Sequence, residues 1–215
     1  MLTAVACAAI LGSSVPDKVD FQLRWKVGDE LTYTVDQKMS PILLDSTGEL
    51  VMTVKKAGEK TYIVSMSQVV FRNEGRAASG DLRAGDVTMT KYGKLVAGTT
   101  NTRAFLAFLA LPEEPVEVGG SFKVKCVIPV VEITIELEGK FVSLGGPTGT
   151  LATLRLKGEF PVEDGEGWPI TVKTTFDTAR GVIVSYSSTL TDIRSSIKLK
   201  QGRRALPSNA AQALF

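Results

Sequence analysis

The chain has 215 residues, of which 44% are hydrophobic and 22% are charged, a composition that supports a buried core and excludes a disordered polymer. Its 25 basic and 23 acidic residues leave a net charge of +2, so charge gives no reason to expect a nucleic-acid partner. There is no histidine, which excludes Ser-His-Asp and Cys-His catalysis, and two cysteines are too few for a cysteine-only zinc site.

Residues 1–16 have the pattern of an export signal. Residues 1–11 are apolar, and small residues suited to cleavage follow at 12–14. We therefore expect an exported protein of the periplasm or cell envelope, with no transmembrane span in its mature chain. A lipid anchor at Cys7 is an alternative, which the Ala at the third position before it and the apolar residues after it disfavour. After cleavage Cys126 would be the remaining cysteine, so no intramolecular disulfide is expected.

Strand patterns dominate from residue 21 to residue 100. Apolar and polar residues alternate at period two from Phe21 to Val27, which predicts a half-buried strand that a Gly28 turn ends. Further strands are predicted at 31–35, 49–54, 62–71, 86–91 and 94–97, with a polar loop at 73–85 and a tight turn at Tyr92-Gly93.

One helix is expected, at residues 101–111. Its apolar residues include Phe105, Phe108 and Leu109, and Pro112 ends it. Because the segment is apolar on nearly every side, we expect a short buried helix that plugs or covers the concave face of the sheet.

The segment from residue 116 to residue 201 repeats the same pattern. Val118-Gly119-Gly120 resembles Val27-Gly28-Asp29, and Gly28 precedes Gly119 by nearly the same interval as Gly93 precedes Gly181. Strands are predicted at 122–128, 131–138, 151–156, 170–177, 182–190 and 196–201, with a bulge, bend or chain reversal at 129 and a left-handed glycine at 181.

These patterns predict an all-β fold of about ten antiparallel strands. The strands are expected to form one strongly curved sheet or (half-)barrel built from two pseudo-repeats, at about 21–100 and 116–201, with the helix between them. An open half-barrel, a closed barrel and a sandwich remain alternatives. We expect one domain, at 17–201, followed by a flexible tail at 202–215.

The chain resembles a loose group of exported bacterial β-rich proteins of unknown function. The residues that carry the resemblance are the Gly28-Asp29 opening, the Val118-to-Phe122 opening after Leu111-Pro112, and the Phe176-to-Ile183 hairpin. In fold outline it is also similar to half-barrel lipoprotein carriers of the LolA and LolB type, in which a long antiparallel sheet curls around a short apolar helix. That resemblance implies a concave face that holds acyl chains.

The function expected is non-catalytic binding of an apolar or lipid-like ligand in the concave face, with lipid or lipoprotein as partner. No catalytic residue, metal or cofactor is predicted. The alternative is a structural or protein-interaction module without a small-molecule ligand. The expected ligand-binding residues are Phe105, Phe108, Leu109, Val124, Cys126, Ile133 and Ile135.

A carboxylate-based hydrolase is a second, less favoured alternative. Asp164, Glu166 and Trp168 form an acidic and aromatic cluster of the kind that glycosidases use. The intervening glycines, however, are typical of a solvated turn. The sequence does not indicate an oligomeric state.

Overall fold

Thirteen β-strands and no helix make up the part of the chain that the structure describes. The structure is a computed structural model, and its described residues are 18–39, 44–67, 71–73, 76–78, 85–98, 111–128, 133–162, 165–191 and 193–203. Eleven strands form one continuous antiparallel sheet in the order β7-β6-β3-β2-β1-β13-β12-β11-β10-β9-β8, and β4 and β5 pair beside β2. The prediction of an all-β antiparallel fold is confirmed.

The strands are β1 (Glu30–Met39), β2 (Leu44–Ala57), β3 (Thr61–Ser67), β4 (Phe71–Asn73), β5 (Arg76–Ala78), β6 (Asp86–Thr90), β7 (Leu95–Ala97), β8 (Ser121–Ile128), β9 (Ile133–Gly145), β10 (Leu151–Phe160), β11 (Trp168–Asp177), β12 (Val182–Leu190) and β13 (Ile193–Arg203).

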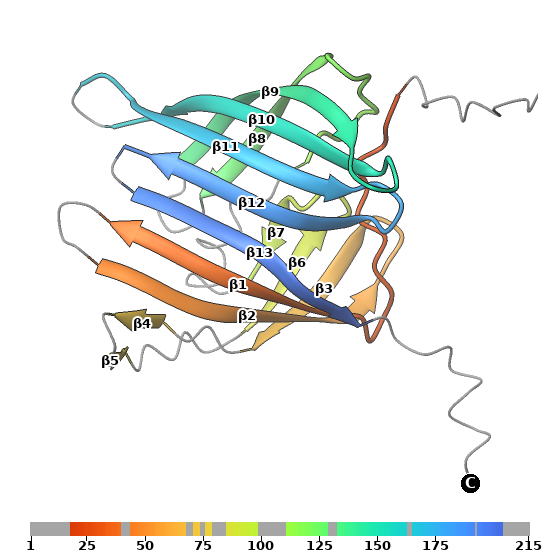
Figure 1. Ribbon diagram of the computed structural model, residues 1–215, viewed down its shortest axis with the longest axis horizontal. Helices are drawn as coiled ribbons and strands as arrows, with labels where there is room; N and C mark the ends of the chain where they lie inside the picture. The colour runs from red at the N-terminus through yellow and green to blue at the C-terminus, as the bar shows by residue number, and fades with distance from the viewer. Residues whose placement is uncertain are drawn as a thin grey trace, which may run out of the picture.

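The sheet is strongly curved, and its two ends turn toward the far side of the view in Figure 1. The halves of the chain meet in its middle, where β1 pairs with β13. The ends are β7 and β8, and no described strand pairs with both, so the sheet is not closed into a barrel. We call the boundary between these two edge strands the seam.

Alternation along the strands places one apolar cluster on the inner face of the sheet. β10 alternates between buried and more exposed residues over most of its length, and β11 does the same from Ile170 to Phe176. Side chains that are at most 1% exposed come from strands across the whole sheet: Leu50, Met52, Val64, Met89, Ile135, Leu137, Phe141, Leu154 and Phe176. Residues far apart in sequence therefore share one core.

The segment predicted as a strand at 21–27 is not one. Residues 18–26, which we call the N-terminal strap, run across one end of the curled sheet, at the right of Figure 1. The Leu23 N–H donates to the Lys91 carbonyl at 2.7 Å, and the Arg24 N–H donates to the Gly181 carbonyl at 3.1 Å. These partners lie in turns of two different hairpins, so the strap crosses strand ends and does not run beside one strand. Period-two alternation revealed its dry side but not its backbone partners.

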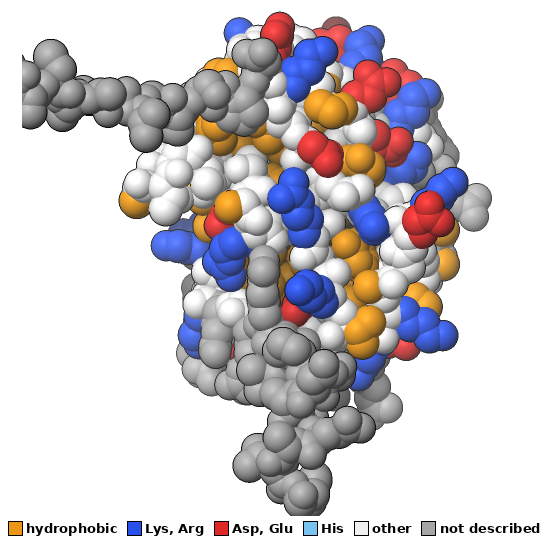
Figure 2. All heavy atoms as spheres, turned by 90° about the vertical axis from the view of Figure 1, so that its right-hand side faces the viewer, with side chains coloured by type: hydrophobic (Ala, Val, Ile, Leu, Met, Phe, Trp, Pro, Cys, Tyr) orange, Lys and Arg blue, Asp and Glu red, His pale blue; other side chains and the backbone are white. Residues whose placement is uncertain are grey.

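The strap is fixed to the core by aromatic side chains. The Phe21 ring is fully buried, 5.2 Å from the Phe141 ring in an edge-on arrangement and 5.6 Å from Phe176. The Trp25 ring lies 5.4 Å from Tyr62, whose hydroxyl donates to the Leu23 carbonyl at 2.9 Å. Figure 2 views this end of the molecule, where basic, acidic and hydrophobic side chains are interspersed.

Some local predictions agree with the structure and others do not. The hairpin of β11 and β12 is confirmed, and Gly181 has a φ of 64°. Of the bulge, bend or chain reversal expected at residue 129, the antiparallel pairing of Ile128 with Ile133 supports the chain reversal. Several boundaries were wrong: β2 and β9 are longer than predicted, β5 lies inside the predicted loop at 73–85, and β13 continues to Arg203, inside the predicted tail.

Other predictions fall outside the described residues. These are the export signal at 1–16, the helix at 101–110 and the tail from residue 204. Leu111, the last residue of the predicted helix, is buried outside any helix, and its N–H donates to the Tyr92 carbonyl at 2.8 Å. The pseudo-repeat stays a prediction. A search of the described residues finds no helix with the length and apolarity that a membrane crossing requires.

Candidate functional site

Three of the predicted ligand-binding residues lie together on the inner face. Val124 and Cys126 are on β8, and Ile135 on β9 is directly opposite Cys126. They are 6%, 2% and 1% exposed, respectively, and belong to the apolar core. Ile133 begins β9, but its side chain is not among those described. Phe105, Phe108 and Leu109 lie outside the described residues.

A hollow of about 690 Å³, the seam groove, runs along the free edge of β8. Apolar lining comes from Leu111, Val116, Phe122 and Val124, of which Phe122 is half-buried and the others are buried. Lys94, which directly precedes β7, lines the same groove. Six further charged residues also line it: Lys18, Glu113, Glu114, Glu117, Lys123 and Lys125. The groove therefore joins the two edges of the open sheet, and one predicted ligand-binding residue, Val124, lies in it.

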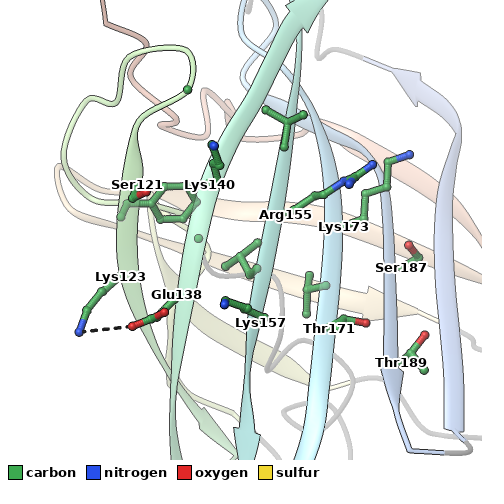
Figure 3. Close-up of a pocket in the computed structure, with 16 residues that line it drawn as sticks. Ser121, Lys123, Glu138, Lys140, Arg155, Lys157, Thr171, Lys173, Ser187 and Thr189 are labelled. Atoms are coloured by element: carbon green, nitrogen blue, oxygen red, sulfur yellow. Dashed lines mark ion pairs between the residues drawn. The ribbon is translucent and has the colours of Figure 1, made fainter.

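A second hollow, of about 1180 Å³, lies on the outer face over β8 to β12, and we call it the outer hollow (Figure 3). Five cations and one carboxylate line it, in a chain whose net charge is only +2. The charged residues are Lys123, Glu138, Lys140, Arg155, Lys157 and Lys173, all on the side of the sheet that faces away from the core.

Strand register aligns part of this charge in one row. Lys140 is directly opposite Arg155, and Arg155 is directly opposite Lys173. Ser121 lies opposite Lys140 at one end of the row, and Ser187 lies opposite Lys173 at the other. In Figure 3 the Arg155 side chain extends toward Lys173. We call these five residues the basic row.

No protein-family model and no curated protein sequence matches this chain. Its function therefore has to be inferred from the seam groove, the outer hollow and the core between them. The likeness in outline to LolA and LolB carriers stays a prediction.

Two polar groups are buried inside the apolar core near the seam. Burial raises the pKa of the Cys126 thiol from 9.0 to about 11, an effect that the charge of Lys94 partly offsets. Burial also raises the pKa of Tyr186, and the nearby Ser188 side chain partly offsets this rise, although their contact lacks ordinary hydrogen-bond geometry. A hydroxyl so weakly bonded is costly to bury, so a polar group of a ligand or a water would find a favourable partner there.

The raised pKa of Cys126 predicts an alkaline loss of stability. The folded state holds the thiol proton more tightly than the unfolded chain does, so the stabilisation is complete below pH 9 and is lost as pH rises toward about 11. We expect the free energy of unfolding of wild type to fall by on the order of 2 kcal/mol more than that of Cys126→Ala across this window. Urea titrations at stepped pH measure the difference. If the free energy of unfolding of the two proteins changed in parallel with pH, the raised pKa of Cys126 would be contradicted.

The acidic cluster considered for hydrolysis is only partly described. Glu166 is exposed on the turn between β10 and β11, and Asp164 lies outside the described residues. Trp168 is 49% exposed and stacks on Phe160 with 6.2 Å between ring centroids. A search of the described residues finds no group of acidic or cysteine side chains that could hold a metal ion.

The basic row was not predicted from the sequence. Lys140, Arg155 and Lys173 each occur on a different predicted strand or beside one, and alternation can place each on the outer face. Their alignment depends on the register of two strand pairs, β9 with β10 and β10 with β11, including a shift between Thr153 and Leu154. Sequence alternation does not fix that register.

Proposed function

We propose that the protein is a non-catalytic, exported binding protein that holds an apolar or lipid-like ligand at the seam and against the inner face of its sheet. The observation that carries the proposal is the seam groove, because it joins an unclosed sheet edge to buried apolar side chains. A groove of about 690 Å³ has the size of a small-molecule site.

The arrangement of the strap supports entry at the seam. The strap crosses one end of the sheet, and the buried side chains of Phe21 and Trp25 occupy the interior there, which supports entry elsewhere. The free edge of β8 has no strand beside it among the described residues. The lack of histidine in the whole chain supports a binding role over acid–base catalysis, and the apolar pattern at 1–16 supports export.

A structural or protein-interaction module is the second candidate. The two unpaired edges, β7 and β8, favour it, because an edge strand can pair with an extended segment of another protein. Outward lysines at Lys123 and Lys125 are of the kind that discourages such pairing on β8. We therefore place this function second.

Native mass spectrometry of protein purified from the cells that export it tests the proposal. We expect a bound mass that organic extraction releases as lipid, and saturable binding of a fluorescent fatty acid to the delipidated protein. Val124→Phe should fill part of the groove and weaken that binding by about fivefold or more, a loss of about 1 kcal/mol of binding free energy. The same change at Val27, which is 56% exposed on the far side of the strap, is the matched control and should leave binding unchanged.

Two results would overturn the proposal. One is wild-type protein that carries no lipid and shows no saturable binding, which would favour the interaction module. The other is a folded Val124→Phe variant, with a cooperative urea transition, that binds the probe as wild type does.

A further inference from the structure

The basic row places like charges directly opposite one another on three adjacent strands. Lys140, Arg155 and Lys173 are all exposed, and none makes an ion pair with a carboxylate of the described residues. Neighbouring strands lie about 4.8 Å apart, so the row repeats positive charge at that interval. Like charges opposite each other destabilise a sheet.

The neighbouring outer-face pairs show the opposite arrangement. Lys123 faces Glu138 across β8 and β9, with 3.8 Å between nitrogen and oxygen. Lys125 faces Glu136 in the same strand pair at 2.7 Å, which raises the pKa of the lysine and lowers that of the glutamate. The same face of the same sheet thus pairs charges of opposite sign outside the basic row. A need for solubility does not account for the basic row, because a surface that alternates positive and negative side chains is equally soluble.

The side chains of the row match the chemistry of phosphate groups. The Arg155 guanidinium can bind a phosphate through two parallel hydrogen bonds, and the flanking lysines add charge without fixing geometry. Ser121 and Ser187 place a hydroxyl donor at each end of the row, and Thr171 and Thr189 add two more in the same hollow. A volume of about 1180 Å³ is larger than a single phosphate requires.

We propose that the outer hollow is a binding site for a ligand that carries two or more phosphate groups, held by Lys140, Arg155 and Lys173. The site is on the opposite side of the sheet from the apolar core, so it does not depend on the proposed seam ligand. Ser121, Phe122 and Lys123 line both hollows, which brings the two sites together at the β8 edge. The ligand is either a soluble polyphosphorylated molecule or the phosphorylated headgroup of a lipid.

The test uses full-length protein at low ionic strength, with one probe for each source. Calorimetric titration with tripolyphosphate tests the soluble source, and flotation with vesicles of phosphatidylcholine, with and without cardiolipin, whose headgroup carries two phosphates, tests the headgroup source. Lys140→Gln, Arg155→Gln and Lys173→Gln are combined in one variant. Lys55→Gln, Lys56→Gln and Lys60→Gln form the matched control, which we call the turn variant. These three lysines are exposed at the end of β2 and in the turn that follows it, and the change removes the same charge.

We expect wild type to bind at least one probe saturably, more tightly than orthophosphate at equal ionic strength. The row variant should bind at least tenfold more weakly, and the turn variant should stay within about twofold of wild type, since only general charge is lost there. The row variant should also unfold at a urea concentration no lower than wild type, because repulsion is relieved. Binding of neither probe, equal weakening by both variants, or full binding by the row variant would overturn the proposal.

Discussion

Replacing Phe21 by alanine is expected to destabilise the protein by about 3–5 kcal/mol, the usual cost of removing a buried phenylalanine ring. Phe21 is 0% exposed, and its ring contacts Phe141 on β9 and Phe176 on β11. Because the strap bonds to turns and to Val116 and is not part of a strand ladder, the space left by the ring cannot be refilled by a shift along a ladder. Urea unfolding at pH 7 measures the loss.

The matched control is Val27→Ala. Val27 follows the strap, is 56% exposed, and should change the free energy of unfolding by no more than about 0.5 kcal/mol. A second readout separates loss of the strap from loss of the sheet. The chain has two tryptophans, so in a Trp168→Phe background the fluorescence of the buried Trp25 reports on the strap alone. If Phe21→Ala cost less than about 1 kcal/mol, the strap would not be part of the cooperative core.

The strap illustrates which features of the fold could be predicted from the sequence: the buried side of a segment could, but its backbone partners could not. Alternation correctly identified the dry side of β8, where Val124 and Cys126 are buried, because side chains of a strand alternate whatever its neighbours are. It also identified the dry side of the strap at Phe21 and Leu23, but described that segment as a strand. Backbone pairing is set by long-range partners, and Lys91 and Gly181 are far from the strap in sequence.

The same limit applies to the candidate sites. Val124, Cys126 and Ile135 could be grouped from the sequence because they share a face of two consecutive strands. The seam groove requires knowing that β7 and β8 are the two ends of the sheet, which follows from the pairing of β1 with β13. Neither a turn motif nor a local alternation encodes that pairing, since its two strands lie at opposite ends of the described chain.

Gly181→Ala is expected to cost about 2–5 kcal/mol. Gly181 has a φ of 64°, where an L side chain costs roughly 1–2 kcal/mol. An added Cβ would also lie 2.6 Å from the backbone nitrogen and the Cβ of Arg24, so the strap would have to move. Overpacking of that kind adds about 1–3 kcal/mol. Urea unfolding measures the sum, and faster hydrogen exchange at the Arg24 amide, which donates to the Gly181 carbonyl, would locate it.

Gly149 provides a matched control for the backbone contribution. Its φ is 67°, nearly that of Gly181, but a Cβ added there meets no atom within 4 Å. Gly149→Ala should therefore show the conformational cost alone, roughly 1 kcal/mol, with no change in exchange at Arg24. The difference between the two variants then measures how tightly the strap is held against the turn between β11 and β12. An equal loss of stability in the two variants would mean that the strap moves away from Gly181 at no measurable cost. The end of the sheet that the strap crosses would then be a second route to the inner face.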